Sequence, residues 1–284
     1  MEKSFLNSLI SIAYLVRALS SLPSSRRFSY KGKKLGTVNI LGTGPSLKDD
    51  FSALLKKCNN ESYFALNDFG TSELFEKIRP QYYILLDPSY WVPHDKCNER
   101  DYQLREILFE RFNTVLSWNM ILFVPWKAIK SNYFSTRITN KNITIVPINY
   151  LNFYPTYSKF YLYILKKNLG VVPVGNVMGG AIYLAINMGF KRINIYGADH
   201  SWTKDLRVND QNQVCTIKKH FFEENEVLEP WRKTNKEIFR MSEVLKMLQS
   251  HFYGYEYLNW FANSVGCKIV NKTKGSFIDS FDRE

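Results

Sequence analysis

The chain has 284 residues, of which 45% are hydrophobic, 15% aromatic and 23% charged. This composition is typical of a globular protein and excludes a disordered or fibrous chain, and the length allows one large domain or two small ones. The net charge of +12 favours polyanions, anionic membrane surfaces or phosphate-bearing substrates as partners.

Positive charge is concentrated at the beginning of the chain. Residues 1–35 contain seven basic residues and one acidic residue, so about one eighth of the sequence carries half of the net charge. A protein that binds nucleic acid usually spreads its basic residues over a folded recognition surface. The sequence also lacks a zinc-finger, homeodomain or RNP signature. We therefore expect no nucleic-acid partner.

An apolar run over residues 5–22 precedes a stretch that contains Arg26 and Arg27. An interfacial helix followed by basic residues is a two-part signal for an anionic membrane surface. The alternatives are a helix packed on the protein's own core, a spanning helix and a secretory signal. Arg17 and several serines weaken the spanning alternative, and the weak basic start weakens the signal. We expect residues 1–35 to hold a cytoplasmic protein at the periphery of the inner membrane.

The four cysteines are Cys58, Cys97, Cys215 and Cys267. They are far apart and form no CxxC pair, which excludes a zinc site built on cysteine spacing. A disulfide framework is not expected in a chain of this length, so the cysteines indicate a reducing compartment.

From Gly36 onward, short β-branched or apolar runs alternate with segments of helical periodicity. Strands separated by helices of about ten residues imply parallel pairing through right-handed crossovers. The sequence therefore predicts an α/β fold with a single doubly wound, mostly parallel Rossmann-like sheet, and we expect one catalytic domain over residues 36–284. The predicted strands are 37–41, 63–66, 82–86, 121–124, 143–148, 192–196 and 267–270, and the predicted helices are 48–58, 71–78, 178–188 and 238–252.

An aromatic-rich stretch interrupts this alternation between Tyr150 and Tyr163. Two interpretations are open. The stretch forms a small helical lid over the site, or it is a helix packed at the edge of the sheet.

The predicted strand ends carry the candidate site. Ligands of such sheets bind beyond the carboxyl ends of the strands. Four ends are polar or rich in glycine, and their convergence is more informative than any one of them. They are the turn Gly42, Thr43, Gly44, Pro45 and Ser46, the pair Asn67 and Asp68, the acid Asp87, and the run Gly197 to His200.

The glycine turn lies between a strand and a helix, where backbone N–H groups can receive a phosphate. The third glycine of a dinucleotide fingerprint is missing, because Leu47 stands there. Asn67 follows the second strand in place of a ribose-binding acid. These departures argue against a nicotinamide dehydrogenase, and the absence of GxxxxGK[ST] excludes a P-loop ATPase.

Several titratable residues are candidates for acid–base work or metal binding. Asp68, Asp87 and Asp199 could take a ribose hydroxyl, a metal or a catalytic role, although any one alone is more often a cap or turn residue. His200 beside Asp199, and His220 before an aromatic–acidic run, could serve as acid or base. His251 is predicted to lie on a surface helix, so we discount it.

The sequence GTGPSL, with Asn67 some 25 residues on, resembles the bacterial sialyltransferases of the Campylobacter type. It is also similar to the related motility accessory factor and 6-hydroxymethylpterin diphosphokinase-like proteins. Further matching features are a helix of small residues at 177–188 with Gly179 and Gly180, the run Gly197-Ala198-Asp199, and the ending at 271–279.

This resemblance implies a GT-A-like variant of the fold and a CMP-linked donor. Gly42 to Ser46 and Asn67 would bind the nucleotide, with Gly179 and Gly180 near it. Thr43 stands where those enzymes carry Asn, and Gly179 where they carry a donor-contacting Ser. Their basic histidine is missing from residues 230–235, so His200 or His220 would have to replace it.

The resemblance thus implies a glycosyltransferase of bacterial surface polysaccharide biosynthesis. It would transfer a sialic-acid-like sugar from a CMP-activated donor to a glycan acceptor, free or lipid-linked. We expect no required cofactor and no metal. Two alternatives stay open: a pterin-type pyrophosphokinase that uses ATP and Mg²⁺, and a non-catalytic polysaccharide assembly protein.

Overall fold

The computed structural model describes residues 32, 35–49, 52, 54, 61–149, 157–172, 174–218, 227–233 and 237–284. Within these residues, seven strands form one parallel sheet in the order β10-β6-β1-β2-β3-β4-β5. The predicted α/β, Rossmann-like class is confirmed. The strands are β1 Leu35–Leu41, β2 Ser62–Leu66, β3 Tyr82–Ile84, β4 Met120–Pro125, β5 Ile143–Ile148, β6 Phe190–Tyr196 and β10 Lys268–Asn271.

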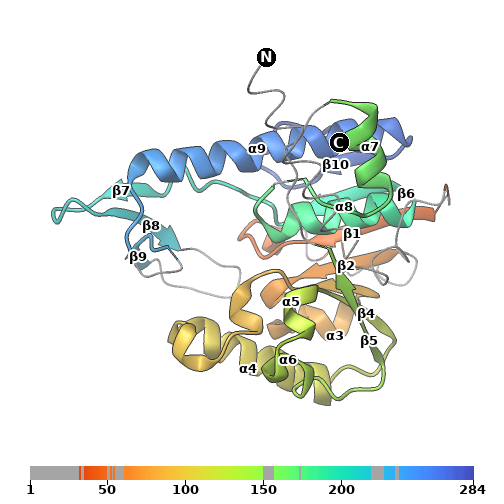
Figure 1. Ribbon diagram of the computed structural model, residues 1–284, viewed down its shortest axis with the longest axis horizontal. Helices are drawn as coiled ribbons and strands as arrows, with labels where there is room; N and C mark the ends of the chain where they lie inside the picture. The colour runs from red at the N-terminus through yellow and green to blue at the C-terminus, as the bar shows by residue number, and fades with distance from the viewer. Residues whose placement is uncertain are drawn as a thin grey trace.

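Helices cover both faces of this sheet, as Figure 1 shows. Successive strand residues point to opposite faces, so Ile40 of β1 enters one core and Leu41 the other. Helices α7, α8 and α9 pack on the first face, and α3 to α6 on the second. Their bounds are α3 Leu74–Ile78, α4 Glu99–Thr114, α5 Trp126–Ile129, α6 Asn132–Ser135, α7 Lys159–Lys166, α8 Val177–Met188 and α9 Met241–Ser264.

The order of the strands places a switch point between β1 and β6. From β1 the chain adds β2 to β5 on one side, and it then returns to place β6 on the other side of β1. The loops that follow β1 and β6 therefore leave in opposite directions. In open α/β sheets this divergence opens a crevice at the carboxyl ends, which is where ligands bind.

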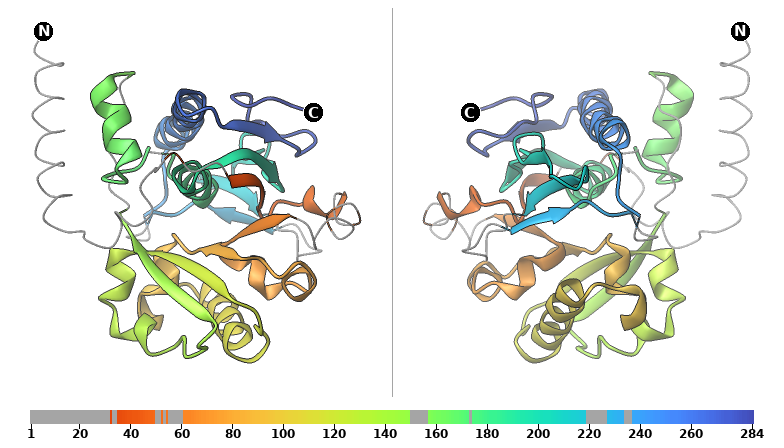
Figure 2. Two further views of the ribbon diagram at one scale, coloured as in Figure 1. Left: turned by 90° about the vertical axis from the view of Figure 1, so that its right-hand side faces the viewer. Right: turned by 90° about the vertical axis from the view of Figure 1, so that its left-hand side faces the viewer.

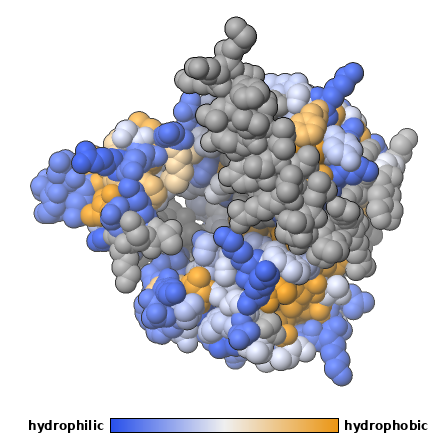
Figure 3. All heavy atoms as spheres, in the orientation of Figure 1, coloured by the Kyte–Doolittle hydropathy of each residue, from blue (hydrophilic) through white to orange (hydrophobic). Residues whose placement is uncertain are grey.

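A small antiparallel sheet follows β6 and was missed in the sequence. It pairs β7 (Leu206–Val208), β8 (Val214–Lys218) and β9 (Val227–Pro230). These strands are too short and too polar to show a clear period of two. Trp202 and Trp231 pack with the first turns of α9 beneath the sheet. Figure 3 shows the surface hollowed between this small sheet and the rest of the domain.

The described part of the aromatic stretch is a packed helix. Tyr157 stacks on Tyr257 of α9 with ring centroids 4.5 Å apart, and Tyr161 lies parallel to Trp260 at 6.5 Å. These contacts favour the edge-helix interpretation over a lid; residues 150–156 lie outside the described part. The apolar run 5–22 also lies outside it. Among the helices that are described, none combines the length and the apolar character that crossing a membrane requires.

Candidate active site at the β1–β6 crevice

The loop after β1 is fastened to the end of β6. Gly42 N donates to Tyr196 O and Gly44 N to Gly197 O, both at 2.9 Å. A Cβ on Gly42 would lie 2.4 Å from Gly197 O, and one on Gly44 only 1.9 Å from Asp199 Oδ2. Both glycines are therefore required by the close approach of the two loops.

Ser46 and Asp199 join the two loops through side chains. Ser46 Oγ donates to Asp199 Oδ2 at 2.8 Å, and Ser46 N lies 3.3 Å from Asp199 Oδ1. Burial raises the pKa of Asp199, while the hydrogen bonds from Ser46 oppose this effect. The structure thus brings together two residues that the sequence singled out separately.

The amides of the glycine turn are largely engaged within the protein. Besides those of Gly42, Gly44 and Ser46, the N–H of Leu47 donates to Gly44 O at 3.1 Å. This arrangement differs from the expectation that the turn offers its N–H groups to a phosphate. The turn instead holds β1 against β6 and shapes one wall of the crevice.

His200, at the other wall, is held in a strained conformation by a hydrogen-bonded network. Its φ is +52°, a left-handed value that is uncommon for a residue other than glycine. Its Nε2 lies 2.6 Å from the hydroxyl of Tyr255, which lies 3.0 Å from Asn176 Oδ1. Asn176 caps α8 by accepting from Gly179 N at 3.0 Å. His200 is thereby tied to the start of α8.

The imidazole of His200 is neutral at physiological pH. Burial lowers its pKa to about 3, the nearby His251 adds to the effect, and a hydrogen bond to the backbone of Ala198 opposes it. The hydroxyl of Tyr255 has one proton for two neighbours, so its direction sets the tautomer of the imidazole. A neutral imidazole can accept a proton, and the low pKa makes His200 a weak base in the absence of bound substrate.

His251 is a residue that the sequence misjudged. It lies on α9 but is partly buried, with its ring 5.7 Å from that of Trp202. A Cβ on Gly175 would come within 2.4 Å of His251 Nε2, so the glycine makes room for the ring. Burial lowers the pKa of His251 to about 4. The helix has exposed residues, as predicted, but the side chain of His251 itself is turned inward and should not have been discounted.

The ends of β2 and β3 form a second polar group. Asn67 begins the 3-10 helix η2 (Asn67–Thr71) with φ +40°, and its carbonyl accepts a hydrogen bond from the hydroxyl of Tyr83. The hydroxyl of Tyr90 donates to Asp68 Oδ1 at 2.6 Å. Burial raises the pKa of Asp68, and the hydrogen bond from Tyr90 opposes the shift. Asn67 is thus fixed at a strand end by its neighbours.

Asp87 and the glycines of α8 have local structural roles. Asp87 is exposed and accepts from Ser89 N at 2.9 Å, which caps the 3-10 helix η3 (Pro88–Tyr90). Gly179 and Gly180 are buried. A Cβ on Gly179 would lie 2.5 Å from the side chain of Val174, so packing explains why glycine stands there.

The remaining predicted site features divide into two groups. Thr43 and Pro45 lie in the loop after β1, and Gly197 adopts φ +63° directly after β6. His220 lies outside the described residues. Over the part of the chain that is described, no three His, Cys, Asp or Glu side chains gather as a metal site would require.

Asn176, Trp202 and Tyr255 were missed in the sequence. Asn176 stands directly before a predicted helix, so its capping role was detectable. Tyr255 carries no local signal, because its contact with His200 arises from the packing of α9.

Comparison with known proteins gives a likeness in structure but no match in sequence. No family model matches the sequence, and no curated protein matches it. The chain is similar in structure to the MAf glycosyltransferase from Magnetospirillum magneticum AMB-1, with 16% sequence identity and a TM-score of 0.49. The match covers 90% of this chain and 34% of that one. This chain therefore spans about a third of the length of the protein that it is similar to.

Proposed function

We propose that the chain is a glycosyltransferase that moves a sialic-acid-like sugar from a CMP-activated donor to a glycan acceptor. The observation that carries the proposal is the joining of Ser46 and Asp199 at the switch point, beside a strained His200. Backbone strain at the mouth of a crevice is typical of functional sites. The resemblance of GTGPSL and Gly197-Ala198-Asp199 to sialyltransferase motifs supplies the substrate class.

The donor nucleotide would lie over the carboxyl ends of β1 and β2. Asn67 can donate and accept, which suits the edge of a base or sugar. The start of α8, where Asn176 satisfies one amide, presents the positive end of a buried helix to the same crevice. The phosphate of CMP and the carboxylate of the sugar are both anionic, so this helix end would favour them.

The reaction would need one proton acceptor. In the proposed step His200 takes the proton of the acceptor hydroxyl while that oxygen bonds to the anomeric carbon of the sugar. The bond from that carbon to the phosphate oxygen breaks, and CMP leaves with the electron pair. Tyr255 would hold the imidazole in one tautomer, and protein N–H and hydroxyl groups would stabilise the departing phosphate. The proposed step uses no cofactor.

A thermal-shift screen with CMP, CDP, UDP, GDP and ATP tests the donor. We expect CMP to raise the melting temperature and Asn67→Ala to remove this response. In a transfer assay with CMP-linked nonulosonates, His200→Ala should abolish turnover and leave the CMP response in place.

Other results would favour the alternatives. Stabilisation by ATP with Mg²⁺ alone would point to a pyrophosphokinase, in which Asp68 and Asp87 act on each other electrostatically and could share a cation. Unchanged cellular glycan in the His200→Ala, His220→Ala and Asn67→Ala variants would point to a non-catalytic assembly protein.

The basic segment would bring this enzyme to its acceptor. We propose that residues 1–35 bind the anionic cytoplasmic face of the inner membrane, where a lipid-linked glycan would be presented. Reversing the charge of Arg26 and Arg27 in the full chain should weaken sedimentation with anionic vesicles. Binding that is unchanged by the reversal would refute this assignment.

A further inference from the structure

Helix α7 and the residue before its N-cap present an exposed aromatic stripe, defined by Tyr157, Phe160 and Tyr163. These residues are 59%, 48% and 53% exposed. Phe160 and Tyr163 are three residues apart on one side of the helix, and Tyr157 lies just before the N-cap Ser158, where it stacks on Tyr257 of α9. Large apolar side chains that gather on a surface in this way mark an interaction site more often than scattered ones do.

The stripe is held in place by the buried side of the same helix. Ile164 and Leu165 belong to the main core, and the carbonyl of Leu165 accepts from the hydroxyl of Tyr183 at 2.9 Å. Ser158 caps the helix by accepting from Tyr161 N at 3.1 Å. Figure 2 shows α7 at the periphery of the molecule, beside α9. The exposed aromatic side chains therefore lie on a helix whose other side is packed in the core.

The charge around the stripe is positive. Residues 157–167 contain Lys159, Lys166 and Lys167 and no acidic residue. The ammonium group of Lys167 lies 5.7 Å from the ring of Tyr163. Burial raises the pKa of Tyr157, and the negative charge of Glu256 on α9, which faces this end of the stripe, adds to the effect. Aromatic rings between lysines are the composition that suits the headgroup region of an anionic bilayer.

We infer that this stripe is a membrane contact of the folded domain, separate from residues 1–35. Charge distinguishes the lipid surface from the other possible occupants. The basic segment has the same sign as α7, so docking one on the other would bring like charges together. A second copy related by a two-fold axis would place the three lysines against their own equivalents. An anionic lipid surface meets both the aromatic and the basic groups.

The test is sedimentation of the full chain with phosphatidylglycerol–phosphatidylcholine vesicles, compared with phosphatidylcholine alone. The double variant Phe160→Ser/Tyr163→Ser should partition about tenfold more weakly into the mixed vesicles. Ile107→Ser and Val208→Ser are matched controls, because these side chains are 44% and 53% exposed on α4 and β7. Both controls should bind as the wild type does.

A second variant, which changes charge only, keeps the test valid if Phe160→Ser/Tyr163→Ser fails to fold. Lys159→Glu/Lys167→Glu should show a weaker preference for phosphatidylglycerol than the wild type and keep the wild-type melting temperature. Residues 1–35 are proposed to bind the same vesicles, so the readout is the loss relative to the wild type. Vesicle binding as strong as that of the wild type in both double variants would overturn the inference. A smaller molar mass of the aromatic variant in light scattering would overturn it too, because the stripe would then hold a second copy. A lowered melting temperature of that variant with unchanged vesicle binding would also overturn it, because the stripe would then be covered by residues 5–22. Sugar transfer to a soluble acceptor should be unaffected, so the two proposals fail separately.

Discussion

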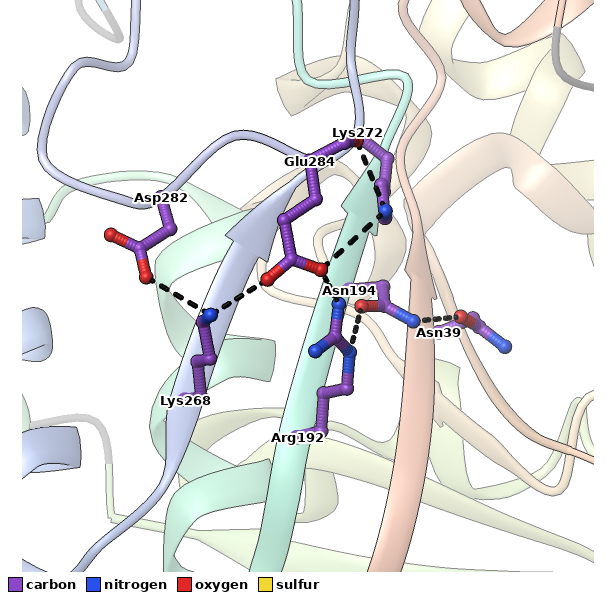
Figure 4. A network of polar contacts seen from close by, with 7 residues as sticks. All are labelled: Asn39, Arg192, Asn194, Lys268, Lys272, Asp282 and Glu284. Carbon is purple, nitrogen blue, oxygen red and sulfur yellow. Dashed lines mark hydrogen bonds and ion pairs between the residues drawn. The ribbon is translucent and has the colours of Figure 1, made fainter.

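Two polar networks lie on the same pair of strands, β1 and β6, and they differ in backbone conformation. One crosses the strands through Asn39, Asn194 and Arg192 to Glu284 near the chain end, as Figure 4 shows. The other begins where the strands end and joins Ser46 to Asp199.

The network across the strands connects β1, β6 and β10 with the last residues of the chain. Asn194 Nδ2 donates to Asn39 Oδ1 at 2.9 Å, and Arg192 Nε donates to Asn194 Oδ1 at 3.0 Å. Lys268 adds ion pairs with Glu284 at 2.6 Å and Asp282 at 3.4 Å (Figure 4). These strand residues have regular backbone, so the network ties the chain end to the sheet without strain.

The network at the strand ends includes a residue with a strained backbone. His200 has a left-handed backbone, and the Tyr255 hydroxyl contacts both His200 Nε2 and Asn176 Oδ1. Holding a residue in a sparsely populated backbone region costs about 1–3 kcal/mol. The left-handed backbone of His200, and not polarity alone, therefore distinguishes the network at the strand ends from the network across the strands.

The largest effect should follow from Gly44→Ala. The new Cβ would lie 1.9 Å from Asp199 Oδ2, so the loops after β1 and β6 must separate. We expect a loss of about 1–3 kcal/mol in the free energy of unfolding and no thermal response to CMP. Gly36→Ala is the matched control in β1, because its Cβ would meet nothing within 4 Å. A Gly44→Ala protein as stable and responsive as the wild type would remove the basis of the comparison.

Tyr255→Phe should lower the free energy of unfolding by a smaller amount. The change leaves His200 Nε2 without its hydroxyl partner, which is worth about 1–2 kcal/mol in urea unfolding. It should also alter the pH profile of kcat, because the imidazole would no longer be held in one tautomer. Tyr253→Phe, at an exposed tyrosine of the same helix, serves as the control. Equal effects of the two substitutions would show that Tyr255 only fills space.

Mild acid should lower the free energy of unfolding through His251. His251 has an ordinary pKa of 6.5 that burial lowers to about 4 in the folded chain. Below pH 6.5 the unfolded chain therefore takes up this proton first, and stability falls as pH drops toward 4. Near pH 5.5 the contribution is about 1 kcal/mol. His251→Asn should show a flatter stability profile than the wild type between about pH 7 and about pH 5. Parallel profiles would contradict the assignment.

The smallest effect should come from Glu284→Gln in the network across the strands. Its carboxylate is at the surface, where ion pairs with Arg192 and Lys268 contribute little because water and salt screen them. We expect a smaller change in melting temperature than for any variant above and an unchanged response to CMP. A lost CMP response would mean that both ends of β1 and β6 serve the crevice.

The fold was largely predictable because its strands are apolar runs with helices between them. Strand 143–148 was placed without error, and the others differ by one or two residues at most of their ends. The last helix was predicted to end at Phe252 but continues to Ser264. Gly254 interrupts its pattern, and the structure explains the glycine, since a Cβ there would lie 2.8 Å from the Cα of Val174.

The site was predictable residue by residue but not as an arrangement. Strand-end chemistry singled out Ser46, Asp199 and His200 separately. Their pairing depends on β6 lying beside β1, which the order of elements along the chain does not dictate. Tyr255 joins through the packing of a helix that begins some forty residues after the strand. Local patterns therefore supplied the groups, while the strand order supplied their partners.

The bond between Ser46 and Asp199 also has a consequence for how the chain matures. It spans 153 residues of sequence, and contacts of such separation form slowly because a long loop must close first. A nascent chain that has not yet made β6 offers no acceptor for the amides of Gly42 and Gly44. The crevice therefore cannot form before β6 is made, and a chain truncated before β6 would possess the glycine turn but no crevice.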